Sequence, residues 1–228
     1  MKLFNENACK TLLRIGRPIA HQTGISKTRY KNLSEKAKTA YKEDSDCLGY
    51  GYFYYGMVRT YLPEIIVAIG SGYGFVPMIL AHGARDNGQG HVHFIDPSLG
   101  PDNCWKNEER TSRRFKLVDV TPKYFTHYKM KNRKFYEDYL DKEFSGWEID
   151  LLFIDGSDKK DDIEFDFWEI GAFVKKDGWI LIHDTEQEKE TSYAEPALIK
   201  KIKTKFSDNF DVIRFPGKAG FSLIRVLT

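Results

Sequence analysis

The stretch that decides the fold is IIVAIGSGYG, residues 65–74. Its first five residues are apolar and mostly β-branched, a composition typical of a strand that is buried on both faces of a parallel sheet. The glycines at positions 70, 72 and 74 allow the backbone to turn sharply and to approach a ligand closely, because they carry no Cβ. We therefore predict a strand over 65–69 that ends in a ligand-binding loop, although a plain strand–helix turn would use the same glycines.

Similar apolar runs alternate with helical stretches along the rest of the chain. Further strands are predicted over residues 91–95, 124–128, 149–154, 179–182, 211–215 and 221–226. Helices are predicted over about 75–82, 105–115, 132–144, 161–175 and 195–206. Gly83 is expected to end the first helix, since glycine is a poor helix former. This alternation is typical of a parallel α/β sheet.

The end of the chain refines this topology. Only five residues, 216–220, separate the last two predicted strands. A parallel crossover needs a dozen or more residues, so this connection requires an antiparallel hairpin. The predicted fold class is α/β, a Rossmann-like doubly wound seven-stranded sheet with five parallel strands and a C-terminal antiparallel hairpin. Residues 1–62 are predicted to be an N-terminal helical cap of the same domain, and residues 63–228 carry the sheet.

Composition and charge indicate a globular protein of the cytoplasm. The 228 residues have a net charge of +2, but residues 1–43 carry ten Lys/Arg against three Glu, which leaves −5 for the remainder. Such a basic arm can attract a polyanion, yet it is more often a solvated helical face, so nucleic-acid binding is not expected. The three cysteines are widely separated, which favours reduced thiols. No apolar run is long enough to span a bilayer, and no secretion signal is evident at the N-terminus.

Asp96 is the first candidate binding residue outside the glycine loop. It ends the second predicted strand, where a carboxylate can accept hydrogen bonds from both hydroxyls of a ribose. An Asp that precedes a proline, here Pro97, also commonly begins a turn. A dinucleotide fingerprint would place glycine at the sixth position of the loop, where this chain has Phe75. The pattern favours a nucleotide-like ligand over a dinucleotide.

A second group of polar residues follows the fourth and fifth predicted strands. Asp155 and Asp158 follow the fourth strand, and His183 and Asp184 follow the fifth. Neighbouring strands of a doubly wound sheet end at one edge, so these side chains are expected to meet in one pocket. Carboxylates with a histidine suit a cation of the Mg²⁺ type or general-base chemistry on a hydroxyl. One or two of them, Asp158 above all, could instead cap the next helix.

Four segments together carry a family resemblance. These segments, residues 68–74, 95–99, 149–156 and 176–184, resemble class I S-adenosylmethionine-dependent methyltransferases. The chain is most similar to the small-molecule O-methyltransferase branch that includes the cephalosporin-hydroxylase-like proteins. The resemblance covers about residues 60–228, and it includes the terminal hairpin.

The resemblance implies specific roles. The glycine loop would wrap the methionine part of the cofactor, Asp96 would hold the ribose, and the segment from Met130 to Asn132 would lie along the adenine. The implied cofactor-binding residues are Gly70, Ser71, Gly72, Gly74, Asp96, Met130 and Asp155. Asp155 and His183 are the implied catalytic residues. Asp155 and Asp184 would hold a metal such as Mg²⁺.

Two positions depart from the relatives' pattern. Many relatives have an acidic residue where this chain has Ala68, and relatives in this branch often have histidine at the position of Asp158. The first change removes a hydrogen-bonding group near the amino end of the cofactor. The second leaves Asp155, Asp158 or His183 as the base.

The predicted function is methylation of an oxygen on a small molecule or saccharide. A homodimer is possible, but the sequence does not give the oligomeric state. Two alternatives remain. One is a catalytically silent module that keeps the fold and the cofactor site, and the other is a nicotinamide-dependent oxidoreductase, which Phe75 and the terminal hairpin disfavour. RNA methylation with help from the basic arm is a weaker third alternative.

Overall fold

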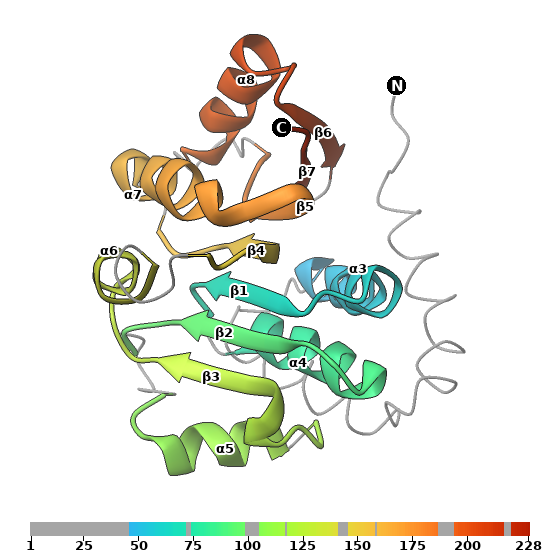
Figure 1. Ribbon diagram of the computed structural model, residues 1–228, viewed down its shortest axis with the longest axis vertical. Coiled ribbons are helices and arrows are strands. Elements are labelled where there is room, and N and C mark those ends of the chain that lie inside the picture. Colours follow the sequence, from blue (N-terminus) through green and yellow to red (C-terminus); the bar gives the residue numbers. More distant parts are fainter. Residues whose placement is uncertain are drawn as a thin grey trace.

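A computed structural model describes residues 46–71, 74–98, 105–116, 118–140, 146–157, 159–186, 194–216 and 220–228. Its centre is a seven-stranded sheet (Figure 1). The strands are β1 (Ile65–Ile69), β2 (His91–Ile95), β3 (Phe125–Tyr128), β4 (Ile149–Ile154), β5 (Val174–His183), β6 (Phe210–Phe215) and β7 (Phe221–Val226). The α-helices are α3 (Asp46–Tyr61), α4 (Phe75–Asn87), α5 (Glu108–Lys116), α6 (Asn132–Phe135), α7 (Lys160–Phe165) and α8 (Glu195–Lys205). Shorter helical turns are η1 (Pro122–Tyr124), η2 (Tyr136–Leu140), η3 (Asp166–Ile170) and η4 (Gly171–Phe173).

The strand order is β3-β2-β1-β4-β5-β7-β6, and it confirms the predicted topology. Strands β1 to β5 are parallel, whereas β7 is antiparallel to both β5 and β6. The chain adds strands on one side of β1 up to β3 and then on the other side from β4 onward (Figure 1). The carboxyl ends of β1 and β4 therefore flank the switch point, the place where ligands bind in open α/β sheets.

The sheet is covered on both faces. Side chains of α3, α4 and α5 form one apolar cluster with one face of the strands, and side chains of α6, α7, α8 and the two π-helical turns η2 and η3 form a second cluster with the other face. All six residues of β4 are buried, as expected for a central parallel strand. This two-sided burial holds the strand tips in place.

Gly83 does not end a helix, so that prediction was wrong. Helix α4 continues to Asn87, and Gly88 caps it in a left-handed conformation. Gly83 lies inside the helix against α3, where a Cβ would come within 2.9 Å of the Val58 side chain. The glycine allows α3 and α4 to pack closely. This packing outweighs the low helix propensity of glycine, so the helix continues through Gly83.

The aromatic run in residues 49–55 lies on helix α3. Tyr50, Tyr54 and Tyr55 are buried, and Tyr54 packs edge-on against Phe153 of β4. The described part of the predicted cap, residues 46–62, therefore packs on the sheet through this run. The rest of the cap, including the basic arm of residues 1–43, lies outside the described residues.

Strand β5 is longer than predicted. It begins at Val174, whereas the sequence indicates a helix up to residue 175. Val174 pairs with Ile149, and the pairing resumes only at Trp179 opposite Leu151, so residues 175–178 form an irregularity. These residues are polar and include a glycine, so the sequence did not indicate a strand there. Helix α5 likewise begins at Glu108 and not at residue 105.

Within the described ranges, no helix combines the length and the apolar character that a membrane span requires.

Candidate active site

A cavity of about 540 Å³ opens at the carboxyl ends of β1, β2 and β4. Its size falls in the usual range for small-molecule sites. It is lined by Ile69, Gly70, Ser71, Ile95, Asp96, Pro97, Lys131, Asn132, Arg133, Asp155, Gly156, Ser157 and Asp162. The cavity therefore lies at the switch point of the sheet, where the topology favours a ligand.

The carboxyl ends of β1, β2 and β4 meet at Gly70. Its backbone N–H donates to the Ile95 carbonyl at 3.0 Å, and the Asp155 N–H donates to the Ile69 carbonyl at 2.9 Å. The φ of Gly70 is +76°, and a Cβ there would lie 2.7 Å from the Gly156 Cα and closer still to the Asp155 carbonyl oxygen. Only glycine combines this left-handed conformation with so close an approach.

Asp96 is held by a chain of hydrogen bonds. Its Oδ2 accepts from the Ser71 hydroxyl at 2.5 Å, and its Oδ1 accepts from the Ser98 backbone N–H at 2.6 Å. The Ser71 hydroxyl in turn accepts from the indole N–H of buried Trp105 at 2.7 Å. A carboxylate offers about four lone-pair positions, so these two bonds leave acceptor capacity on both oxygens for a ligand.

Trp105 also explains the third glycine of the loop. Gly74 has φ +92°, and a Cβ there would overlap the Trp105 ring. The ring is 1% exposed and packs edge-on against Phe94. The Trp105 side chain thus packs against the glycine loop at Gly74 and donates a hydrogen bond to it at Ser71.

Asp155, His183 and Asp184 form a compact polar cluster. His183 Nδ1 lies 2.9 Å from Asp184 Oδ1 and 3.8 Å from Asp155 Oδ1. One ligand atom from each residue lies within 4.8 Å of the others, a geometry that could hold a metal ion. Asp184 has a left-handed backbone, with φ +56°. Such conformations are uncommon outside glycine and occur often at functional sites.

The cap contributes to the surroundings of this cluster. Tyr50 of α3 lies edge-on to the His183 ring, with 6.3 Å between ring centroids, and it also packs against Phe221 of β7. The cluster is therefore bordered by the aromatic run of the cap and by the terminal hairpin.

The structure brings several of the predicted site residues together. Gly70, Ser71, Asp96 and Asp155 line one cavity, and Asp155 also joins His183 and Asp184 as expected. Gly74 packs against Trp105 and is not among the residues that line the cavity. Met130 packs against the apolar cluster on the α8 side of the sheet, and the cavity is lined by its neighbours Lys131 and Asn132 instead.

Gly72 and Asp158 lie outside the described residues. Ala68, whose alanine departs from the relatives' pattern, is fully buried.

The sequence did not indicate Arg133, Ser157 or Asp162 as site residues, nor the contact between Asn132 and Asp166. Arg133, Ser157 and Asp162 line the cavity, and Asn132 donates through Nδ2 to Oδ1 of buried Asp166. Burial raises the pKa of Asp166 to about 7. Nothing in the spacing of Asn132 and Asp166, 34 positions apart, predicts this contact.

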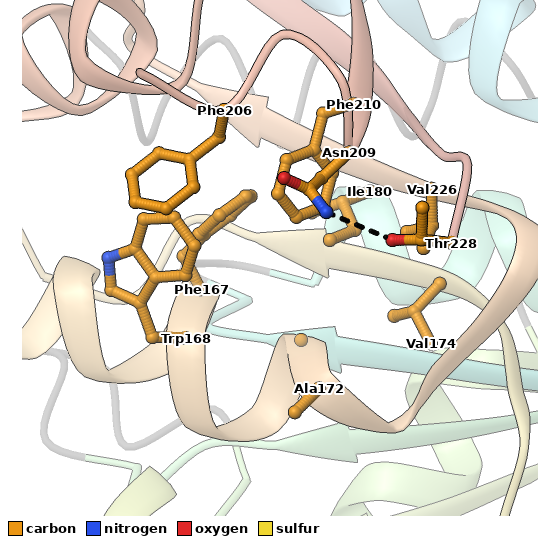
Figure 2. A pocket seen from close by; sticks show the side chains of 11 residues that line it. Phe167, Trp168, Ala172, Val174, Ile180, Phe206, Asn209, Phe210, Val226 and Thr228 are labelled. Carbon is orange, nitrogen blue, oxygen red and sulfur yellow. Dashed lines mark hydrogen bonds between the residues drawn. The ribbon is translucent and has the colours of Figure 1, made fainter.

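A second cavity, of about 330 Å³, lies beside η3 and the terminal hairpin (Figure 2). The rings of Phe167, Trp168, Phe206 and Phe210 form much of its wall, and Asn209 donates to Thr228 at its rim. The described residues that line it include no acid, base or thiol. It therefore lacks the groups that acid–base chemistry needs.

Structural comparison relates the fold to solved methyltransferases. A putative caffeoyl-CoA O-methyltransferase from Staphylococcus aureus matches with a TM-score of 0.68 and 14% identity, over 97% of this chain and all of the other. The O-methyltransferase TomG from Streptomyces achromogenes, in complex with SAM, matches with a TM-score of 0.61 and 16% identity, over 86% and 89% of the two chains. The methyltransferase PaMTH1 from Podospora anserina, bound to SAH, matches with a TM-score of 0.59 and 16% identity, over 99% and 97%.

Sequence comparison gives the family. No curated protein matches the sequence. The profile of a family described as methyltransferase domain matches residues 67–185, which are 119 of the 228 residues and include both the glycine loop and the His183 cluster. The predicted resemblance to class I methyltransferases is thereby confirmed, and the chain belongs to the methyltransferase domain family.

Proposed function

We propose that the protein transfers a methyl group from S-adenosylmethionine to an oxygen of a small molecule or saccharide. One observation carries the proposal. Asp155 lines the cavity at the switch point and also belongs to the cluster with His183 and Asp184. A cofactor site and a set of acid–base groups therefore share one residue, as a methyl donor next to a hydroxyl acceptor would require.

The residues of the cavity fit an adenosyl cofactor. Asp96 keeps acceptor capacity on both carboxylate oxygens, which suits the two hydroxyls of a ribose. Gly70 brings the backbone to the cavity edge without a side chain. Asn132 adds a carboxamide that can pair with a base. S-adenosylmethionine, when bound, supplies an electrophilic methyl group for an in-line displacement.

The chain's own contribution to the reaction would be to orient the acceptor and to take up its proton. A neutral His183 that donates its Nδ1 proton to Asp184, 2.9 Å away, would carry its lone pair on Nε2, and this tautomer would accept a proton from a hydroxyl. Asp155, 3.8 Å from the same Nδ1, would stabilise the imidazolium that forms. Asp155 itself is the alternative base.

A divalent cation is a second use of the same cluster. Asp155 and Asp184 would supply carboxylate oxygens, the ligands that Mg²⁺ prefers, and His183 could supply a nitrogen. A cation there would lower the pKa of a bound hydroxyl and make a protein base less important. Chelation by EDTA distinguishes this use of the cluster from the base role of His183.

The names of the structural neighbours support an oxygen acceptor, since two of them are described as O-methyltransferases. The family match disfavours the nicotinamide-dependent alternative. The catalytically silent alternative makes a different prediction, namely cofactor binding without turnover, so the test measures both.

The test combines binding with turnover. Calorimetric titration with S-adenosylhomocysteine should give micromolar affinity, and a labelled methyl group from S-adenosylmethionine should appear in a panel of phenols, catechols and sugars. The variants Asp155→Asn, His183→Gln and Asp184→Asn should lose about 10²–10⁴-fold in turnover, the usual contribution of a general base. Asp211→Asn, at an exposed position on β6, is the matched control.

Each outcome has a defined meaning. Wild-type protein that does not bind S-adenosylhomocysteine would refute the cofactor assignment. Binding without transfer to any acceptor would favour the silent module. If EDTA abolishes turnover and Mg²⁺ restores it, the cluster holds a cation, and if EDTA has no effect, the base role of His183 is favoured.

A further inference from the structure

Asp166 is an unusual carboxyl group next to the cavity. It begins η3 and has no exposed surface. Its Oδ1 accepts a hydrogen bond from Asn132 Nδ2, whereas its Oδ2 has no hydrogen-bond partner among the described residues. An incompletely paired carboxyl group is costly to bury, so a role beyond packing is expected for it.

The groups around Asp166 leave its charge poorly compensated. Burial has the largest effect on the Asp166 carboxyl and raises its pKa, and the hydrogen bond from Asn132 opposes it. The charge of Asp162 of α7 raises the pKa further, whereas the charge of Arg133 of α6 lowers it. Arg133 is partly engaged by Asp162, with 3.8 Å between the charged atoms. The β4 loop faces Asp166 with Gly156, which has no side chain. The result is a pKa of about 7, so the carboxyl group changes charge near neutral pH.

Asn132 connects this carboxyl group to the cavity. Asn132 is one of the residues that line the cavity, and its Oδ1 accepts from the Arg133 backbone N–H at 3.1 Å. Nδ2 and Oδ1 are attached to the same planar carbon, so directing Nδ2 at Asp166 turns Oδ1 to the other side. An amide oxygen has two lone pairs, and one remains for a ligand.

We propose that Asp166 is a positioning residue that holds the Asn132 amide with its oxygen toward the cavity, and thereby selects a base with an exocyclic amino group over one with an oxo group. The inference rests on the proposed function, because it assumes that the cavity takes an adenosyl group. It adds a specificity determinant that does not itself touch the ligand.

The protonation state of Asp166 gives the inference a measurable signature. An ionised carboxylate can only accept, so it requires Nδ2 of Asn132 and leaves the amide oxygen for the ligand. A protonated carboxyl group can donate to the amide oxygen, which favours the opposite orientation and offers the NH₂ group to the ligand. Preference for an amino base should therefore rise as the pH increases through about 7.

The experiment compares two ligands that differ at this one position. The Kd values of S-adenosylhomocysteine and S-inosylhomocysteine are measured by calorimetry between pH 5.5 and 8.0 for wild-type protein, Asp166→Asn and the control Asp211→Asn. The ratio of the two Kd values cancels the titration of groups that act equally on both ligands. We expect the wild-type preference for the adenosyl ligand to rise about tenfold over this range, the effect of roughly one hydrogen bond. Asp211→Asn should match the wild type, whereas Asp166→Asn should give a flat ratio.

The outcomes separate this inference from the proposed function. If S-adenosylhomocysteine binds but the wild-type ratio does not change with pH, the role of Asp166 is refuted and the proposed function stands. A pH profile that persists in Asp166→Asn refutes it as well. If neither ligand binds at any pH, both proposals fail. The wild-type ratio needs no variant, so the test remains decisive even if Asp166→Asn does not fold.

Discussion

Replacing Gly70 with alanine tests whether the junction of the strand tips determines the stability of the sheet. Two effects add at this position. A left-handed conformation costs an ordinary residue about 1–2 kcal/mol, which is partly offset by the lower entropy of the unfolded chain. In addition, the new Cβ would lie 2.7 Å from the Gly156 Cα and closer to the Asp155 carbonyl oxygen, so the β4 tip must move by about 1 Å to reach ordinary contact.

That movement would weaken the two hydrogen bonds that join the tips, from Gly70 to Ile95 and from Asp155 to Ile69. At about 1 kcal/mol each, they bring the expected loss for Gly70→Ala to about 3 kcal/mol. Gly88→Ala is the matched control, because Gly88 has nearly the same φ, +74°, but nothing within 4 Å of its Cβ position. It should lose only about 1 kcal/mol.

Urea denaturation followed by circular dichroism measures both values. A loss of 1 kcal/mol corresponds to about 2–4 °C in Tm for a domain of this size, so thermal melts should separate the variants by about 4–8 °C. Equal destabilisation of Gly70→Ala and Gly88→Ala would show that the backbone conformation alone accounts for the effect. Close approach at the strand tips would then add nothing to the cost of the substitution.

Three further predictions concern stability. Gly83→Ala should destabilise the protein by about 1–2 kcal/mol, because the new methyl group would press against Val58. Adding Val58→Ala to the same chain should recover part of this loss. Purely additive effects in this double-mutant cycle would show that the two side chains do not interact. Asp150→Ala should lower the free energy of unfolding by about 2–3 kcal/mol, measured by urea denaturation. The loss should exceed that of Lys175→Met, because Asp150 accepts from two backbone N–H groups as well as from Lys175. Equal losses for the two variants would show that the backbone hydrogen bonds contribute little. The pKa of Asp166 is raised from 3.8 to about 7, so the folded state keeps a proton that the unfolded chain releases, and stability should fall as the pH rises from about 4 to about 7. Thermal melts of Asp166→Asn across this range should show a smaller decline than the wild type, and an unchanged slope would assign the pH dependence to other groups.

Much of the candidate site follows from local sequence. The run before Gly70 and the run before Asp96 were predicted as strands with the observed bounds, and the short link at 216–220 gave the antiparallel hairpin. Asp155 and His183 were expected to meet because their strands are neighbours, and the structure brings them together. These predictions succeed because strand periodicity, turn length and parallel topology act over short stretches or through simple rules of sheet order.

Other features depend on contacts that no local pattern encodes. Trp105 donates to Ser71, and Asn132 donates to Asp166, in both cases across 34 positions of the chain.

The sequence by itself determined the order of strands and helices, the loop with its glycines and the carboxylates at the strand ends, since each follows from the conformational preferences of neighbouring residues. Tertiary structure alone decided that Gly83 lies where two helices pack closely, that Trp105 donates a hydrogen bond to Ser71, and that Asp166 lies buried beside Asn132. The physical reason is that burial, close packing and the pKa of a carboxyl group depend on which distant side chains surround it, and those neighbours are fixed only when the sheet and its two helical layers have assembled.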